Sequence, residues 1–177
     1  MSFSVLKKKS NVRRSFKNYN KKKEESGIAV IDMNNIKGIV KFENKGLKSV
    51  KVTYKITGLS EGLHGFHIHS SGDLTDGCNS ACAHFNPTGE NHGGPHSKVR
   101  HAGDLGNINS KNNLAEGRIT VEGISVNSKS SRSIIGRTII IHQDPDDLGK
   151  GQDEESKKTG NAGKRIACAV IGLKPGC

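Results

Sequence analysis

Hydrophobic and polar positions alternate in short runs from Gly27 onward. The clearest run covers residues 48–57, where Val50, Val52, Tyr54 and Ile56 alternate with lysines and threonines. An alternation with a period of two is typical of a half-buried antiparallel strand. Similar short runs lie at residues 28–33, 38–42, 65–69, 118–121, 137–142 and 166–173, separated by Gly, Asn or Ser. No segment has a helical period over more than three turns, so the pattern predicts seven or eight short strands in an antiparallel sandwich or barrel.

Two long segments interrupt this rhythm, one from residue 70 to about residue 104 and one from residue 143 to residue 164. Loops longer than about 15 residues are uncommon in compact domains and usually have a function. The unusual residues of the chain lie in these segments or at their edges.

The chain of 177 residues has the length of one domain, and its 22 glycines fit a structure rich in turns. No apolar run approaches the roughly 18 residues that a membrane helix needs, so we expect no membrane partner. No segment resembles a secretory signal peptide, and we therefore expect a cytoplasmic location.

The formal net charge of +11 raises the question of nucleic-acid binding. Residues 1–25 alone carry +7 in a stretch without apolar periodicity. We predict a basic, disordered tail over residues 1–26 and a folded domain over residues 27–177. Organelle targeting, nuclear targeting and loose polyanion binding remain open for the tail. The rest of the chain lacks the clustered basic and aromatic positions of single-strand binders, so a nucleic-acid partner is not expected.

Histidines carry the chemical signal. Seven of the eight lie between His64 and His101. His67 and His69 are two residues apart on a predicted strand, so their imidazoles project from one face. The eighth, His142, ends another predicted strand. The first long segment contains three more candidate ligands and is followed by a carboxylate: His84, His92, His101 and Asp104.

These residue types fit two metals. Four imidazoles suit Cu(II) in a tetragonal arrangement, and three imidazoles with one carboxylate suit tetrahedral Zn(II). Seven ligands then serve eight coordination positions, which requires one histidine to contact both metals. His64 and His96 have no place in these sets and are interpreted as structural or exposed.

At this point the chain resembles a known family. The segments GLHGFHIH (62–69), GDLTDGC (72–78), HFNP (84–87), HGGP (92–95), RHAGDLGNI (100–108), GRTIIIH (136–142), DDLGKG (146–151) and TGNAGKRIACAVIG (159–172) look like those of a copper,zinc superoxide dismutase. The resemblance covers about residues 28–173 and leaves out the tail. It implies an all-β fold, an eight-stranded antiparallel Greek-key barrel or sandwich of immunoglobulin-like type with two long functional loops.

The resemblance also implies an activity in antioxidant defence and its cofactors. Superoxide would be converted to dioxygen and hydrogen peroxide by one-electron cycling of copper between Cu(II) and Cu(I), with one copper ion and one structural zinc ion per subunit. The implied copper ligands are His67, His69, His84 and His142, and the implied zinc ligands are His84, His92, His101 and Asp104, with His84 as a bridging imidazolate. The implied supporting residues are Asp146, which orients a ligand of each metal, Arg165, which positions superoxide, and Lys158, Glu154 and Glu155, which guide the anion.

The resemblance also leads to expectations for the cysteines and for the partners of the protein. The resemblance pairs Cys78 with Cys168 in a disulfide. Cys82 is a departure from the family pattern, for which we expect an inert buried thiol, although competition for the disulfide or reaction with copper remains open. We expect Cys177 to be a free terminal thiol. Residues 70–71, both serine, stand where the family commonly has a larger residue in its dimer contact. The apolar segments 134–136 and 169–173 still favour a homodimer, and a copper chaperone is a further expected partner.

An alternative is a metal-binding domain of the same fold without dismutation, such as a chaperone or a structural module. Such a domain is expected to have lost a copper ligand or the arginine. All seven ligands and Arg165 are present, which favours the enzyme.

Overall fold

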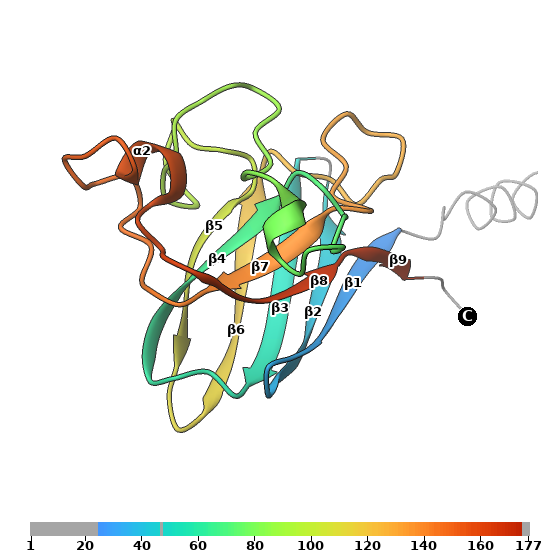
Figure 1. Ribbon diagram of the computed structural model, residues 1–177. Coiled ribbons are helices and arrows are strands. Elements are labelled where there is room, and N and C mark those ends of the chain that lie inside the picture. Colours follow the sequence, from blue (N-terminus) through green and yellow to red (C-terminus); the bar gives the residue numbers. More distant parts are fainter. Residues whose placement is uncertain (1–24, 47, 175–177) are drawn as a thin grey trace, which may run out of the picture.

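Two antiparallel β-sheets packed face to face form the protein (Figure 1). The computed structural model describes residues 25–46 and 48–174. The five-stranded sheet has the order β6 (Leu114–Glu122), β3 (Ser49–Thr57), β2 (Ile36–Lys45), β1 (Ser26–Met33) and β9 (Gly172–Lys174). The four-stranded sheet has the order β5 (Asp104–Ser110), β4 (Gly62–His69), β7 (Thr138–His142) and β8 (Arg165–Val170).

The chain crosses between the sheets in a Greek-key manner. After the meander of β1, β2 and β3 it builds β4 and β5 in the other sheet, and then returns so that β6 pairs with β3 and β7 pairs with β4. The predicted all-β antiparallel fold is confirmed. The predicted run at 166–173 is divided in two at the buried Ile171, so that β8 and β9 belong to different sheets, and the described residues form nine strands instead of eight.

Asparagine pairs form two of the tight turns, the β-hairpin between β1 and β2 and the connection from β5 to β6 between the two sheets. Asn34 and Asn35 join β1 to β2 with φ angles of 52° and 66°, and Asn112 and Asn113 between β5 and β6 have φ angles of 51° and 62°. Two-residue turns with positive φ match the twist of the flanking strands, and asparagine tolerates this left-handed conformation better than most residues.

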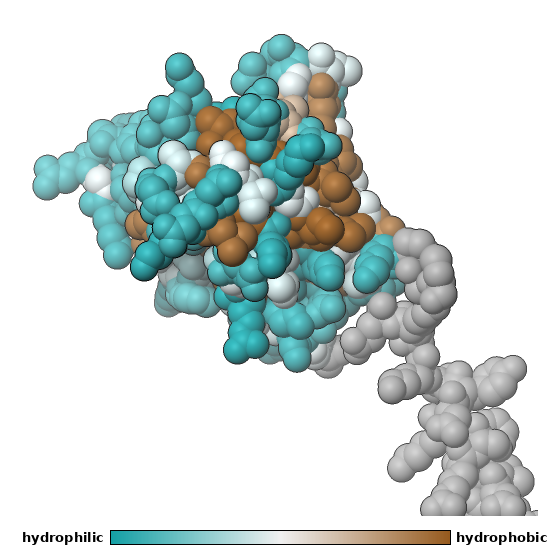
Figure 2. Space-filling model, turned by 90° about the horizontal axis from the view of Figure 1, so that it is seen from below, coloured by the Kyte–Doolittle hydropathy of each residue, from teal (hydrophilic) through white to brown (hydrophobic). Residues whose placement is uncertain are grey.

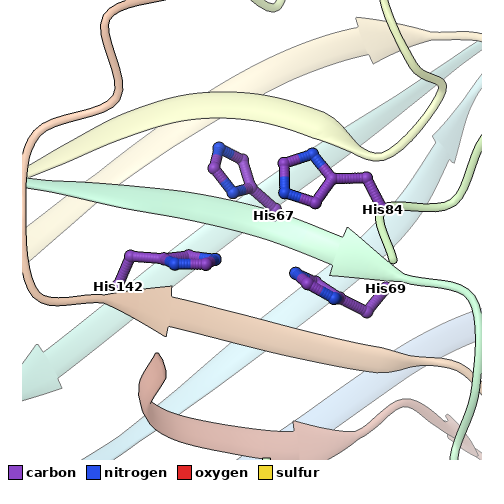
Figure 3. Close-up of side chains that lie close together, drawn as sticks. All are labelled: His67, His69, His84 and His142. Carbon is purple, nitrogen blue, oxygen red and sulfur yellow. The ribbon is translucent and has the colours of Figure 1, made fainter. Parts of the chain in front are cut away.

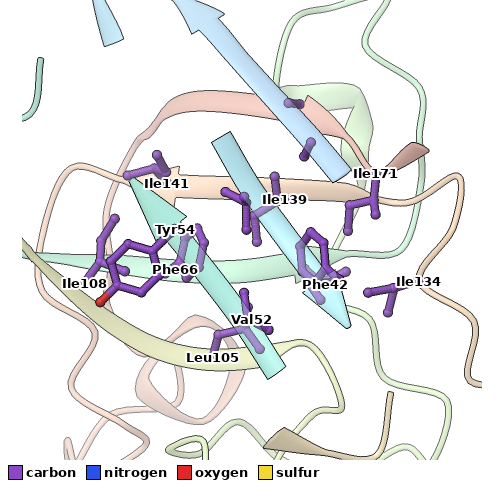
Figure 4. Close-up of a cluster of buried hydrophobic side chains, with 14 of the residues drawn as sticks. Phe42, Val52, Tyr54, Phe66, Leu105, Ile108, Ile134, Ile139, Ile141 and Ile171 are labelled. Atoms are coloured by element: carbon purple, nitrogen blue, oxygen red, sulfur yellow. The ribbon is translucent and has the colours of Figure 1, made fainter. Parts of the chain in front are cut away.

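The core lies between the sheets and follows the predicted alternation. Val50, Val52, Tyr54 and Ile56 of β3 are buried, whereas the lysines and threonines between them are at least partly exposed. The opposite sheet contributes Phe66 and isoleucines of β7 (Figure 4). Each such side chain contributes about 1.5–3 kcal/mol when fully buried. This packing fixes which faces of β4 and β7 point outward.

The outward faces of β4 and β7 are covered by the two long segments predicted to be loops. The first contains only a short 3₁₀ turn (Asn79–Ala81), and the second contains α2 (Ser156–Thr159). Because these segments cover the sheet, the histidines on its outer face are also buried. The fold therefore provides a second, polar interior beside the apolar one.

Two expectations concern residues beyond this description. Nearly all of the predicted tail, residues 1–26, lies outside the described residues, and β1 begins at Ser26. Cys177 also lies outside them. Within the described residues, no helix has the length and apolar character needed to cross a membrane.

Candidate metal centre

Three of the predicted ligands come from the outer face of neighbouring strands. Phe66 and Ile68 of β4 point into the core, so His67 and His69 point away from it. In β7 the same alternation directs Ile141 inward and His142 outward. His67 pairs with Ile140 and His69 with Thr138 across the two strands, which places His142 beside the β4 histidines.

A fourth imidazole completes this first group. His84 is held against β4 by an isolated β-bridge to His69, and the four rings point toward one another (Figure 3). One nitrogen of each ring lies within 4.8 Å of the others. Each of the four rings has one buried nitrogen without a hydrogen-bond partner: His67 Nδ1, His69 Nε2, His84 Nε2 and His142 Nε2. Buried nitrogens are rarely left unpaired, and four converging ones fit a metal ion that accepts their lone pairs.

The other ring nitrogens of the strand histidines are engaged elsewhere. His69 Nδ1 donates to the carbonyl of Cys82 at 2.7 Å, and His142 Nδ1 donates to the carbonyl of Gly163 at 3.1 Å. A carbonyl only accepts, so each ring carries its proton on Nδ1 and directs the lone pair of Nε2 toward the centre of the group. The tautomers are thereby set for metal binding.

The second group surrounds a single carboxylate oxygen. His84 Nδ1, His92 Nδ1 and His101 Nδ1 lie 2.8, 3.0 and 3.2 Å from Asp104 Oδ1. His92 Nδ1 has no hydrogen-bond partner in this arrangement and is therefore free to bind a metal. Three nitrogens and one oxygen that converge in a buried site match the donor set of tetrahedral zinc. His84 takes part in both groups, with Nε2 in the first and Nδ1 in the second.

Asp146 links the two groups. Its Oδ2 accepts from His67 Nε2 at 2.8 Å, and its Oδ1 accepts from His92 Nε2 at 2.8 Å and from the amide of Leu148 at 2.7 Å. The side chain of Asn107 holds the backbone of Asp146 through two further hydrogen bonds of 2.8 and 2.7 Å. These contacts explain why His67, His92 and Asp146 cluster without needing a third metal ion.

Burial and hydrogen bonding set the ionisation of the protein groups. Burial lowers the pKa of His67 to about 3 and that of His142 to about 4, so both are neutral at pH 7. Burial opposes ionisation of Asp104, yet hydrogen bonds from the surrounding histidines outweigh it and lower the pKa of this carboxyl. Burial also disfavours the charged form of His92, but its two carboxylate partners raise its pKa to about 9. Metals bind neutral imidazoles and ionised carboxylates, so His67 and His142 are ready to bind, whereas zinc binding has to displace a proton from His92.

A pocket of about 690 Å³ leads from the surface to the first group. His69, His84 and His142 form part of its lining, together with Arg165. The guanidinium of Arg165 donates to the carbonyls of Cys78 at 2.8 Å, Asn79 at 3.0 Å and Cys82 at 2.7 Å. These neutral acceptors fix the group, and no described carboxylate forms an ion pair with it.

The predicted guiding residues lie differently with respect to this pocket. Lys158 and Glu155 line it. Glu154 does not, and its carboxylate instead accepts from Lys157 Nζ at 3.0 Å on the exposed surface.

The cysteines and the two remaining histidines are also placed. Cys78 and Cys168 form the expected disulfide, which joins the first loop to β8. The expectation of a buried thiol at Cys82 is wrong, because this free cysteine is exposed. His64 is buried, with Nδ1 2.9 Å from the carbonyl of His142, and His96 is exposed, in agreement with their assignment as structural or exposed.

Sequence reasoning missed two positions that support the site. Cys82 acts through its backbone, since its carbonyl accepts from both His69 and Arg165. Asn107 acts through its side chain on Asp146. The first has no side-chain signal at all, and the second is a polar residue in a segment where no strand was expected.

Known proteins are similar to this chain in sequence and in fold. The Copper/zinc superoxide dismutase (SODC) family matches residues 36–171. "Superoxide dismutase [Cu-Zn] A" of Xenopus laevis is 54% identical over 140 residues, which cover 79% of this chain and 91% of the relative. "Superoxide dismutase [Cu-Zn]" of Paramecium bursaria Chlorella virus 1 is 52% identical over 151 residues, which cover 85% of this chain and 79% of the relative. The crystal structure of the clock protein EA4 superposes with a TM-score of 0.81 at 41% identity, covering 85% of this chain and 96% of that one. The chain therefore belongs to the copper/zinc superoxide dismutase family.

Proposed function

We propose that the protein is a superoxide dismutase, an oxidoreductase that converts superoxide to dioxygen and hydrogen peroxide. The observation that carries this proposal is a pair of buried ligand groups that share His84 beneath a pocket lined by Arg165. Copper/zinc superoxide dismutase relatives with more than half of their aligned residues identical support it.

The protein takes one copper ion and one zinc ion as cofactors. We assign copper to His67, His69, His84 and His142, because four nitrogen donors suit Cu(II). We assign zinc to His84, His92, His101 and Asp104, because this N₃O set suits a closed tetrahedral site. When bound, copper supplies the one-electron chemistry that oxidises one superoxide and reduces the next, whereas zinc has no redox chemistry in proteins.

The residues of the chain then bind the substrate and move a proton. Arg165 borders the same pocket as the copper group, and its planar, permanently charged guanidinium suits a small anion better than a flexible lysine. His84 holds its two ring nitrogens toward different groups. We assign to His84 Nε2, when it is not bound to copper, the uptake of one proton and its delivery to the reduced substrate, and solvent in the open pocket supplies the second proton that hydrogen peroxide requires.

Charges around the pocket guide the anion in this proposal. Lys158 lies at the pocket wall and attracts superoxide. Glu155 at the same wall, and Glu154 beyond it, repel the anion from unproductive positions. Such steering raises association rates, and superoxide dismutase is itself an established example of it.

Two histidine variants test the proposal. His142→Gln removes a copper ligand, and we expect loss of both copper binding and dismutation with an unchanged near-UV circular dichroism spectrum. His96→Gln is the matched control because His96 is exposed and away from both groups. Full dismutation by His142→Gln would contradict the copper assignment.

A homodimer is part of the proposal. Val170 and Leu173 are 39% and 45% exposed, and Ile135 is partly exposed. Figure 2 shows apolar residues gathered on the side where β1 and β9 lie in Figure 1. Burial of apolar surface favours association, and the small Ser70 and Ser71 reduce the contact area available. Sedimentation at micromolar concentration tests this: a dimer is expected, and a single monomer boundary would refute it.

Three further proposals come from the sequence. We propose that a copper chaperone loads the protein, that it acts in the cytoplasm, and that residues 27–177 form the catalytic domain with residues 1–26 as a separate tail. Co-expression with and without a copper chaperone, followed by metal analysis, tests the first. Cell fractionation tests the second, and removal of the tail tests the third.

A further inference from the structure

A second groove lies outside the metal centre and is rich in positive charge. It has a volume of about 740 Å³ and runs between the loop that carries His96 and the segment that follows β6. Four permanent cations line it: Lys48, Lys98, Arg100 and Arg132. Glu90 is the only described residue that borders both this groove and the pocket of the metal centre.

Two guanidinium groups converge within the groove on Gly123. A Cβ atom built on this glycine would lie 3.6 Å from Nη2 of Arg100 and 3.6 Å from Nη1 of Arg132. Gly123 has a φ of 87°, a conformation that favours glycine over other residues. The space between the two cations is therefore kept free of any side chain from this position.

The hydrogen bonds of these guanidiniums leave their charge uncompensated. Arg100 donates to the carbonyls of His101, Ala102 and Glu122, and Arg132 donates to the carbonyl of Gly123. Each guanidinium has five N–H groups, so donors remain on both.

Carboxylates are present but do not pair with the cations. Glu90 and Glu122 line the groove. Among the described residues, however, no carboxylate oxygen lies within 4.0 Å of a nitrogen of Lys48, Lys98, Arg100 or Arg132. Two like-charged guanidiniums that face one open space, without an ion pair to any described carboxylate, form a site that attracts an anion.

We propose that this groove binds a small polyvalent phosphate, either an inorganic polyphosphate or the triphosphate chain of a nucleotide. Guanidinium groups match phosphate oxygens in a bidentate manner, and the lysines add charge at a greater reach. The four cations outnumber the two carboxylates of the groove, and the attraction by this net positive charge grows with the charge of the anion, so a singly charged anion gains less than a polyvalent one. The ligand is thus distinct from superoxide, and the site is distinct from the pocket over Arg165.

Calorimetric titration with inorganic triphosphate tests the site on the full-length, metal-loaded protein at a constant ionic strength of about 0.1 M, where the Debye length is about 10 Å. Arg132→Glu should weaken binding by at least about tenfold, since it removes a charge-assisted hydrogen bond and introduces a repulsive charge. Arg118→Glu is the matched control, because Arg118 is exposed on β6, lies outside the groove and gives the same net charge. Its affinity should stay within about twofold of that of the unmodified protein.

Equal losses in the two variants would overturn the proposal, because they would show general attraction to a basic chain that includes the tail. The absence of binding by the unmodified protein would overturn it as well. Dismutation by Arg132→Glu should remain unchanged.

Amide chemical shifts locate the ligand when copper is in its diamagnetic Cu(I) form. Triphosphate should shift the amide signals of Gly123 and Ser125 and leave that of Gly163 beside the metal centre unchanged. Shifts centred on Gly163 would refute a separate site. A parallel titration with ATP distinguishes the sources: equal affinity supports free polyphosphate, and an affinity more than about tenfold higher supports a nucleotide whose nucleoside adds contacts.

Discussion

Replacing Asp146 by asparagine tests how the two metal sites are held in place. The carboxylate accepts from His67 through one oxygen and from His92 through the other, both at 2.8 Å. An asparagine has one acceptor oxygen and one NH₂ group. Whichever way the amide is oriented, its NH₂ group faces a ring N–H that needs an acceptor. One of the two histidines must then rotate or change its tautomer, and its Nδ1 lone pair no longer points toward the metal.

The expected loss of metal affinity is that caused by one misdirected ligand. Partners that orient a metal ligand typically contribute about 10–100-fold in metal affinity. This corresponds to roughly 1.4–2.7 kcal/mol of binding free energy. Competition against a chromophoric chelator at pH 7 measures the affinities for copper and zinc separately, and we expect at least one of them to fall by this amount.

The control is Asp32→Asn, which makes the same change of charge at an exposed carboxylate that forms an ion pair with Lys37 at 3.6 Å. Its metal affinities should stay near those of the unmodified protein. If Asp146→Asn also kept both affinities within about twofold, Asp146 would not orient the ligands, and the reasoning on tautomers would fail.

Three further predictions concern charge, pH and the tail. Arg165→Gln should lower the dismutation rate on the order of tenfold and weaken its dependence on salt, as followed by stopped-flow kinetics. In the metal-free folded protein, the pKa values of His67 (about 3) and His142 (about 4) are lower than in the unfolded chain. Between these values and pH 6.5 the unfolded chain therefore binds more protons than the folded protein. The free energy of unfolding then rises with pH by roughly 1.4 kcal/mol per pH unit for each group. Above pH 6.5 the raised pKa of His92 (about 9) reverses the sign, and urea unfolding should show a maximum near pH 6.5. Removal of residues 1–26 should leave the dismutation rate unchanged.

Each of these has a result that would contradict it. A rate of Arg165→Gln that keeps the full salt dependence would mean that other charges steer the anion. Stability of the metal-free protein that keeps rising to pH 9 would argue against the ion pairs of His92. A tail-deleted protein with a changed rate would show that the tail contributes to the enzyme.

Much of the fold was predictable because it depends on local alternation. β3 is an example, since each apolar residue of its pattern is buried. β5 was not predicted, because Gly106, with a φ of 78°, and a register shift opposite residues 65–67 interrupt its alternation. Two buried apolar residues of β5, Leu105 and Ile108, are consequently three positions apart and do not show a period of two.

The candidate ligands were predictable because metals require particular side chains at reachable positions. His67 and His69 share one strand face, and the motifs of the family supplied the remainder. Contacts made by backbone atoms could not be predicted in this way, because they do not depend on a particular side chain. The carbonyl of Cys82, which holds His69 and Arg165, has no signature in the sequence, and the exposure of its thiol depends on how the loop turns at a φ of 63°.

The groove at Gly123 shows the same limit. Arg100 and Arg132 are 32 positions apart in the sequence. They approach each other only because the loop before β5 packs against the segment after β6. A charge pattern that depends on such tertiary packing becomes visible in the structure alone.

The most direct test of the central claim combines metal analysis with a dismutation assay on the full-length protein. We expect one copper and one zinc ion per chain, rapid consumption of superoxide, and loss of activity when copper alone is removed by a chelator. Full copper occupancy without dismutation, or dismutation that persists after copper is removed, would contradict the account.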